Sequence, residues 1–170
     1  FSITSAFTGS IPHLLAELFK RHHGLSTPYI FYKDSTSAQN DVSTGRVAIM
    51  FDILPGALPQ IRSGRMKAVA IVGDAPAKEL PSVPLLSGLL PPHGVGGWNG
   101  IVVPSATPRT TVERINADIV AAVATPVLQE RLAAMTVDVA TGTPAAFDEF
   151  IRTEIAGWGQ VVRNTGVRID

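Results

Sequence analysis

The chain has 170 residues, of which 45% are apolar and 16% charged, and its 14 basic residues balance 14 acidic ones. This length suits one globular domain, or one small domain with part of a second. Balanced charge without runs of one sign argues against a nucleic-acid or anionic-membrane partner, and the lack of cysteine excludes disulfides, thiolate nucleophiles and thiolate metal sites.

The first half of the chain alternates strand and helix patterns. Because Phe1 already stands in a strand pattern and is not Met, we expect a fragment of a longer protein. The expected elements are a strand at 2–5, a helix from 11 to about 23, a strand at 28–32, a weak helix at 35–43, a strand at 47–51, a helix ending near 61 and a strand at 67–72. Such alternation predicts an α/β fold with parallel strands and helices on both faces of the sheet.

The second half begins after residues 73–97, whose prolines and glycines predict a linker. We expect a strand at 98–103, a helix with an apolar face around 112–123, a helix from Pro126 to about 135, a short strand at 136–140 and a last helix opening at Pro144. None of these apolar runs approaches the roughly 20 residues of a membrane span.

The loop that joins the first strand to the first helix is the first candidate site. It comprises Ser5, Ala6, Phe7, Thr8, Gly9 and Ser10. Unpaired N–H groups and the helix dipole favour an anion at such a helix start, and open α/β sheets bind ligands at this edge. The alternative is purely local, with Ser10 capping the helix and Gly9 making the turn.

Three further residues end strands at the same predicted edge. Asp52 follows the strand at 47–51 and either accepts from a ligand or orders water there, or caps the following turn. Tyr32 and Lys33 end the strand at 28–32, and Lys33 offers a cation to an acidic ligand unless it is an ordinary solvated lysine.

Metal binding and known catalytic motifs find little support. His13, His22 and His23 lie on one predicted helix, but their spacing does not match the i and i+4 pair of a helical metal site. The run from Gly94 to Gly100 lacks the third glycine of a dinucleotide loop and precedes a strand. No triad spacing, Walker loop or H-E-x-x-H motif occurs.

Taken in order, a set of short motifs resembles one receptor family. The motifs are Ser5 to Leu14, Tyr32-Lys33, Met50-Phe51-Asp52, Leu54-Pro55, Leu80 to Pro84, Trp98-Asn99-Gly100, Pro104 to Pro108, and Trp158. Together they resemble the substrate-binding receptors of tripartite tricarboxylate transporters, also called Bug-type receptors, over essentially the whole chain.

The resemblance implies a periplasmic receptor of the type II periplasmic-binding-protein fold, which closes around a small carboxylate and delivers it to membrane permease subunits. It implies no cofactor and no catalysis. The loop from Ser5 to Ser10 would be one half of the ligand site, with His13 just inside the helix. The loop of the other domain, and the strand before it, are absent from this sequence.

The resemblance also assigns the parts of the chain. Residues 1–97 would form most of the second, ligand-binding domain, and residues 98–170 would cross back to the first domain, whose N-terminal part is absent. Helices that lack that domain would expose apolar side chains, so we expect a cover, either a second copy in a homodimer or the missing half.

Departures from the family pattern leave alternatives open. Phe7 and Thr8 stand where small or amide residues are usual, so Phe7 either narrows the pocket or favours an apolar or aromatic acid, and Asp34 stands where Gly usually follows Lys33. Two rival functions remain: a small hydrolase or isomerase using His13 with Asp52, and a pocketless interaction or sensory module in which Phe7 fills the site.

Overall fold

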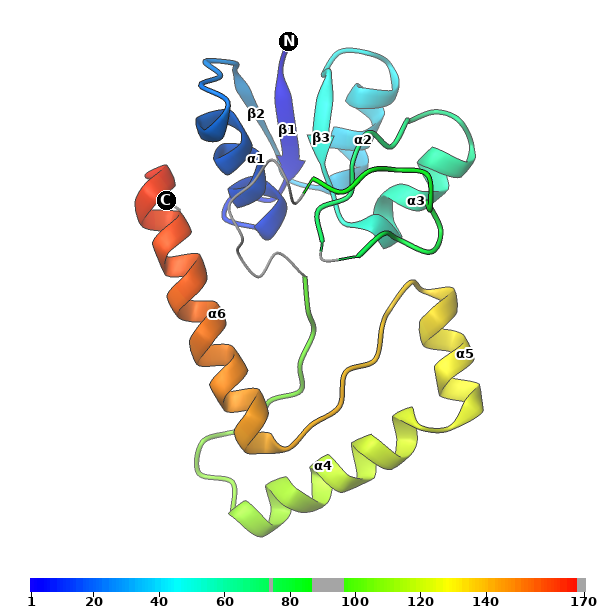
Figure 1. Ribbon diagram of the computed structural model, residues 1–170, viewed down its shortest axis with the longest axis vertical. Helices are drawn as coiled ribbons and strands as arrows, with labels where there is room; N and C mark the ends of the chain where they lie inside the picture. Colours follow the sequence, from blue (N-terminus) through cyan, green and yellow to red (C-terminus); the bar gives the residue numbers. More distant parts are fainter. Residues whose placement is uncertain (74, 87–96, 168–170) are drawn as a thin grey trace. The chain divides into compact units, whose positions relative to one another are not determined.

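The computed structural model describes residues 1–73, 75–86 and 97–167 (Figure 1). Contacts divide the chain into two units, one comprising residues 1–97 with 157–170 and the other residues 98–156. Residues 157–170 therefore group with the N-terminal unit, whereas the sequence-based division placed them with residues 98–156. The assignment of either stretch to a domain of a larger receptor stays a prediction.

A three-stranded parallel sheet organises the first unit. Its strands are β1 (Ile3–Ala6), β2 (Tyr29–Tyr32) and β3 (Ile49–Phe51), in the order β2-β1-β3 (Figure 1). Every residue of the central strand β1 is buried, as expected for a parallel strand covered on both faces. The parallel α/β architecture expected from the alternating pattern is confirmed.

Three helices follow the three strands, and the signals at their ends are readable in the sequence. They are α1 (Ile11–His22), α2 (Ser35–Ser43) and α3 (Leu54–Arg62). Asp34 caps α2 by accepting a 2.8 Å hydrogen bond from the Ser37 N–H. Gly24 follows the end of α1 with φ 60°, a left-handed conformation that glycine adopts without steric cost.

Alternation along β2 shows which helix covers which face of the sheet. Tyr29 and Phe31 point to one face, where both rings contact His13 of α1. Tyr32 points to the other face, where its hydroxyl donates to Asp41 of α2. Helices α1 and α2 therefore pack on opposite faces of the sheet.

The core of the first unit lies between α1 and the end of the last helix, α6 (Pro144–Thr165). It gathers buried Leu14, Leu15 and Leu18 of α1 with Leu86 and Val161. The α1 leucines follow helical spacing, so one face of the helix is apolar. Helix α6 begins in the second unit, and its last turns contribute Val161 to this core.

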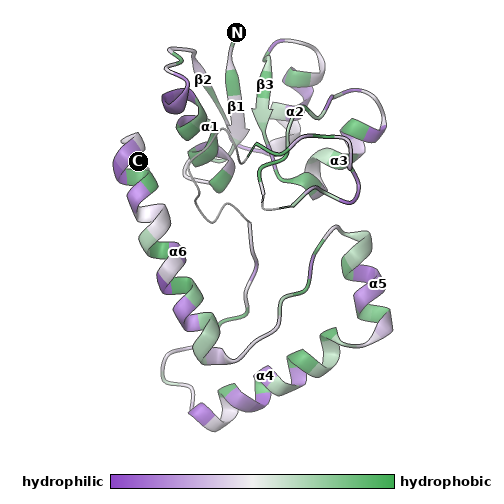
Figure 2. Ribbon diagram, viewed as in Figure 1, coloured by the Kyte–Doolittle hydropathy of each residue, from purple (hydrophilic) through white to green (hydrophobic). Residues whose placement is uncertain are grey.

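The second unit contains α4 (Arg109–Val123), α5 (Pro126–Ala134) and the first turns of α6. Neither α4 nor α5 has a buried residue, and Figure 2 shows hydrophobic and hydrophilic residues interleaved along α4 and α6. The predicted apolar face of α4 is only half-buried, and it comprises Val112, Ile115, Ile119 and Val123. An aromatic cluster of Trp98, Phe147 and Phe150 joins the start of this unit to α6.

Three predicted strands do not form. At 67–72 the structure has a single parallel bridge between Ile71 and Leu85, and the neighbouring Pro84 has no N–H with which to extend a ladder. Residues 98–103 and 136–140 are irregular, because a strand needs a neighbouring strand for its backbone hydrogen bonds and the described residues supply none. The linker predicted at 73–97 lies partly outside the described residues.

Within the part of the chain that the structure describes, no helix is both long and apolar enough to cross a membrane.

Candidate functional site

The carboxyl ends of the three strands meet at one edge of the sheet. The register pairs Ala6 of β1 with Tyr32 of β2, and Ser5 of β1 with Phe51 of β3. The loop after β1, the turn after β2 and Asp52 after β3 therefore follow the same edge. This is the edge at which open α/β sheets bind their ligands, and the structure places every predicted site residue at the ends of β1 and β2, in these segments or in the first turn of α1.

The loop after β1 is a tight turn with two left-handed residues. Phe7 has φ 59° and Gly9 has φ 79°. The Phe7 N–H donates to the Tyr32 carbonyl at 3.3 Å, and the Ser10 N–H donates to the Phe7 carbonyl at 3.2 Å. A bulky residue at positive φ is uncommon and persists only where its surroundings hold it. The backbone of Phe7 is held from both sides, although the residue as a whole is 57% exposed.

The hydroxyl of Ser10 is occupied inside the loop. It accepts a long hydrogen bond of 3.4 Å from the His13 N–H and donates a 2.8 Å hydrogen bond to the Ala6 carbonyl. The first bond is the N-cap of α1, and the second ties the helix start to the end of β1. The Ser10 hydroxyl therefore holds the loop, in agreement with the local alternative weighed for this residue.

Two backbone N–H groups of the loop remain open. Within the described ranges, the N–H groups of Thr8 and Ile11 make no hydrogen bond. Thr8 is exposed and Ile11 is half-buried. Both groups lie at the positive end of the α1 dipole, where an anion is favourable. They are the groups of this loop that an anionic solute can use without displacing a protein bond.

His13 is buried, with only 3% of its surface exposed. Its Nδ1 accepts a 2.9 Å hydrogen bond from the Gly9 N–H. Its ring lies 4.6 Å from that of Tyr29 and 5.6 Å from that of Phe31, centre to centre. Burial lowers the pKa of His13 below that of a free imidazole, with Glu17 opposing and Lys20 adding to the effect. The neutral imidazole is therefore the favoured form.

Tyr29 is a site residue that the sequence reading did not single out. Its hydroxyl shares a hydrogen bond with the hydroxyl of Ser5, which is 1% exposed at the end of β1. Burial raises the pKa of Tyr29, partly offset by this bond to Ser5. Because side chains alternate along a strand, Tyr29 and Tyr32 of β2 point to opposite faces of the sheet. The hydrogen bond between the Tyr29 and Ser5 hydroxyls follows only from the strand register.

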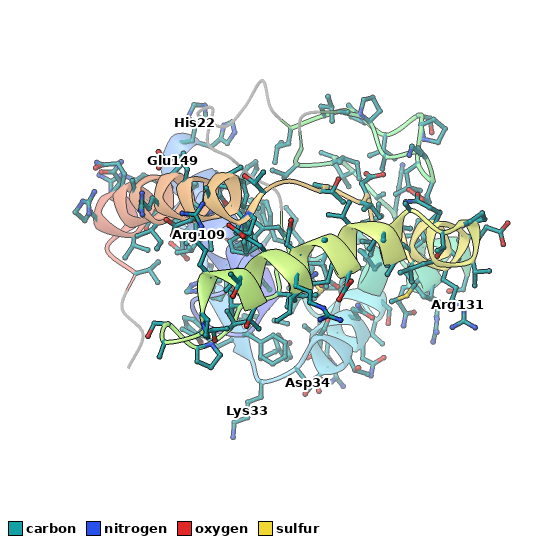
Figure 3. The ribbon with its side chains drawn as sticks, turned by 90° about the horizontal axis from the view of Figure 1, so that it is seen from below. His22, Lys33, Asp34, Arg109, Arg131 and Glu149 are labelled. Carbon is teal, nitrogen blue, oxygen red and sulfur yellow. The ribbon has the colours of Figure 1, made fainter. Side chains whose placement is uncertain are left out.

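Tyr32 and Lys33, at the end of β2, differ in their surroundings. The Tyr32 hydroxyl donates a 2.6 Å hydrogen bond to Oδ2 of Asp41, and this bond raises the pKa of Tyr32. Lys33 is exposed, and Figure 3 shows its side chain pointing away from the ribbon. The Tyr32 hydroxyl therefore has a protein partner already, and Lys33 has the setting of a solvated lysine.

Asp52 is the centre of a polar network behind the edge. Its Oδ2 accepts from Gln39 Nε2 at 2.7 Å and from the Ser35 hydroxyl at 3.1 Å. Its Oδ1 accepts from the Ile53 N–H at 2.9 Å. Gln39 is buried and also donates to the Gly56 carbonyl. This network joins β3 to α2 and α3, which favours the capping alternative for Asp52.

The geometry does not unite His13 with Asp52. His13 is engaged with Gly9 and two aromatic rings, whereas Asp52 is engaged with Ser35, Gln39 and Ile53. A general base must reach the proton that it abstracts, and here the two side chains have separate partners. Among the residues that the structure covers, no group of three or more acidic or histidine side chains gathers as a metal site.

A separate shallow hollow lies in the second unit. It encloses about 400 Å³, and it is lined by Val120, Val123, Ala124, Gln129, Asp138, Val139 and Thr141. Among these lining residues Asp138 alone is charged, and none is basic. It offers no cation to an acidic solute, so it is not the expected carboxylate site.

The fold and this edge define a class of protein. A parallel sheet carries a loop at its carboxyl edge that presents open N–H groups at a helix start, which is how α/β solute-binding proteins hold small anions. The sequence matches the tripartite tricarboxylate transporter family receptor over residues 1–167. The chain therefore belongs to this family of receptors, as its ordered motifs predicted.

Two curated relatives support the membership. Protein BugT of Bordetella pertussis is 33% identical over 162 residues, which cover 95% of this chain and 50% of BugT. The UPF0065 protein in the clcB-clcD intergenic region of Pseudomonas knackmussii is also 33% identical, over 91% of this chain and 92% of that protein. The chain thus spans about half the length of BugT and most of the length of the second relative.

Solved structures agree with the fold. A periplasmic transporter matches all of this chain and 57% of its own, with a TM-score of 0.82 and 26% identity. MatC from Rhodopseudomonas palustris, solved with bound malate, matches 94% of this chain and 56% of its own, with a TM-score of 0.77 and 25% identity. These likenesses confirm the periplasmic-binding-protein fold expected from the sequence.

Proposed function

We propose that this chain is the solute-binding part of an extracytoplasmic receptor that captures a small carboxylate. The single observation that carries the proposal is the pair of open N–H groups at Thr8 and Ile11, at the start of α1. Each favourable charge at an exposed helix start contributes roughly 0.3–1 kcal/mol, and more where water is excluded. The malate bound to MatC, a structural relative, supports a carboxylate as the solute class.

The role of each predicted residue follows from its contacts. We assign direct solute contact to the backbone of Thr8 and Ile11, and a position beside the solute to the exposed ring of Phe7. The side chains of Ser5, Ser10 and His13 hold the loop, because each is already bonded within it or to β2. An exposed Phe7 leaves room at the loop, which argues against the pocketless module.

The transport role is part of the same proposal. As in the family to which the chain belongs, the receptor would work in the periplasm and pass its solute to permease subunits without chemical change. A second domain would close over the loop, and closure biased by the solute requires that the closed form bind it more tightly. The enzyme alternative lacks support, because His13 and Asp52 have separate partners.

We also propose a cover for the exposed apolar side chains of the second unit. Ile101, Val102, Val127 and Ile155 are each at least 66% exposed. Apolar surface of this extent usually meets a partner. The occupant is either a further segment like the half of BugT that this chain does not match, or a second copy. Light scattering separates the two, because the first predicts the 18.0 kDa monomer and the second twice that mass.

Isothermal titration tests the carboxylate proposal. The chain is titrated with mono-, di- and tricarboxylates, aromatic acids included, and the solution is assayed for new products. Ser10→Pro is the diagnostic variant, since proline removes the N–H that donates to Phe7 and the capping hydroxyl together. Ser63→Ala, at the end of α3, is the matched control.

Saturable binding of one acid, lost in Ser10→Pro and kept in Ser63→Ala, supports the receptor. Binding that survives Ser10→Pro places the site elsewhere. If no acid binds, either to this chain or to a longer product of its reading frame, the carboxylate receptor is wrong. Turnover of any acid favours the hydrolase or isomerase instead.

A further inference from the structure

The buried imidazole of His13 occupies an unusual position, because it is bonded to the loop in front of its own helix. Its Nδ1 accepts the Gly9 N–H across one turn, at 2.9 Å. An imidazole nitrogen accepts a hydrogen bond only when it carries no proton. The geometry therefore requires a neutral ring with its proton on Nε2.

This bond divides the N–H groups of the loop into two sets. Gly9 donates to His13 and Ser10 donates to Phe7, so both of these groups are occupied. Thr8 and Ile11 are left open on either side of them. Loss of the His13 bond would remove a contact that holds Gly9 at φ 79°, and glycine adopts other backbone conformations at little steric cost.

The ring itself is held by packing from β2. Tyr29 and Phe31 lie against it, and the Tyr29 hydroxyl is bonded to Ser5 at the end of β1. One cluster therefore anchors both sides of the loop, at Ser5 before it and at Gly9 within it. A ring fixed in this way positions an acceptor rather than merely filling space.

We propose that His13 is the positioning residue of the solute loop, and that its neutral ring holds Gly9 so that the N–H groups of Thr8 and Ile11 stay directed to a carboxylate. This inference rests on the proposed function for the identity of the solute. The hydrogen bond from the Gly9 N–H to His13 Nδ1, called the lock below, is a property of the free protein. Protonation turns Nδ1 into a donor that faces another donor, which releases Gly9 and weakens solute binding.

The charged surroundings of His13 decide the direction of this effect. On α1, Glu17 and Lys20 both act on the His13 ring, and they form an ion pair in which Lys20 Nζ lies 2.9 Å from Glu17 Oε1. On β2 the titratable neighbour is Tyr29, which is neutral near pH 7. The bonded partners on β1 and the loop, Ser5 and Gly9, do not titrate. Burial outweighs Glu17 and lowers the pKa of His13, so the lock opens only as pH falls below the ordinary imidazole value of about 6.5.

Two substitutions at His13 test the hydrogen-bond acceptor and the aromatic ring independently. His13→Asn keeps an acceptor at the position of Nδ1 but loses the ring, whereas His13→Phe keeps the ring and loses the acceptor. His22→Asn, at the exposed end of α1, is the matched control. The readouts are hydrogen exchange of the Gly9 amide by NMR, and the affinity for malate by titration.

We expect His13→Phe to speed Gly9 exchange and to weaken malate binding by about tenfold each, because loss of the partner of this half-buried donor costs about one such factor. His13→Asn and His22→Asn should stay within about twofold of the parent chain, because both retain the acceptor to Gly9. Equal losses in both His13 variants, or faster exchange in His13→Asn alone, would mean that the ring acts by packing and would overturn the inference.

A pH series on the unmodified chain covers the case in which His13→Phe does not fold. As pH falls below the ordinary imidazole value of about 6.5, the parent chain should lose Gly9 protection and malate affinity, while His13→Asn loses neither beyond the titration of malate itself. A parent chain that keeps Gly9 protection down to the pH at which it unfolds overturns the lock. If malate and the other acids never bind but Gly9 behaves as described, the lock stands and the receptor proposal falls.

Discussion

The side-chain amide of Gln39, in α2, donates a 2.7 Å hydrogen bond to the carboxylate of Asp52 at the end of β3. Because Gln39 is buried and Asp52 also accepts from Ser35 and Ile53, the pair joins a strand to the helices on either side of it in sequence. We expect Asp52→Ala to lower the free energy of unfolding by about 1–3 kcal/mol, the cost of leaving a buried donor unsatisfied. Urea denaturation measures it.

A double-mutant cycle with Gln39→Ala provides the control for Asp52. The free energies of unfolding lost in the two single variants should sum to more than the free energy lost in the double variant, because each substitution removes the same hydrogen bond. Asp52→Ala that leaves stability unchanged and abolishes acid binding would contradict this structural role, and would return Asp52 to the ligand-contacting role considered from the sequence.

Tyr32→Phe tests whether a predicted site hydroxyl serves the fold. Its bond to Asp41 is lost, so stability at pH 7 should fall by about 1 kcal/mol while carboxylate affinity is unchanged. In the folded chain the pKa of Tyr32 is raised, so the contribution is complete below the ordinary tyrosine value of about 10 and is lost as pH rises from that value through the higher pKa of the folded chain.

Thermal unfolding between pH 8 and about 11 tests whether the contribution of Tyr32 to stability falls as pH rises. The parent chain should lose more stability across this range than Tyr32→Phe does. A variant that keeps its stability but loses acid binding would instead make the Tyr32 hydroxyl a solute contact.

Phe7→Gly separates backbone strain from the effect of the ring. Phe7 has φ 59° and is 57% exposed, so little packing is lost when the side chain is removed. Relief of the left-handed strain should raise the free energy of unfolding by at most about 1 kcal/mol, reduced by the entropy of glycine. Chemical denaturation measures the gain.

Phe7→Ala is the matched variant, because it removes the ring and keeps the Cβ that causes the strain. Both variants should shift the ratio of affinities for aromatic and aliphatic acids equally, whereas only Phe7→Gly should gain stability. An unchanged ratio in both would show that Phe7 does not line the solute site.

Val161→Ala tests the packing of the end of α6 with α1. Val161 is fully buried in the cluster of Leu14, Leu15, Leu18 and Leu86. Loss of its two methyl groups and the resulting cavity should cost about 2 kcal/mol. The adjacent Val162, 36% exposed, is the control, and its replacement by alanine should change stability by less than about 0.5 kcal/mol. Equal effects would mean that residues 157–167 do not belong to this core.

Much of the fold could be predicted because its signals are local. Ser10 and Asp34 cap their helices and Gly24 follows the end of α1, and each acts within a few residues of its own position. The strands at 67–72, 98–103 and 136–140 were predicted wrongly for the opposite reason. A strand pattern states that a segment suits a sheet, but the hydrogen bonds of a strand come from a neighbour that the pattern does not name.

The sequence by itself determined the alternating α/β order, the edge at which the candidate residues gather and the family to which the chain belongs. Only the tertiary structure decided which groups at that edge are already engaged. The hydroxyls of Ser5 and Tyr29, and the side chains of Gln39 and Asp52, meet through strand register and helix packing, whereas the Gly9 N–H meets His13 through the turn that opens α1. Hydrogen bonding depends on distances of a few tenths of an ångström between groups far apart in the chain, and only packing sets those distances.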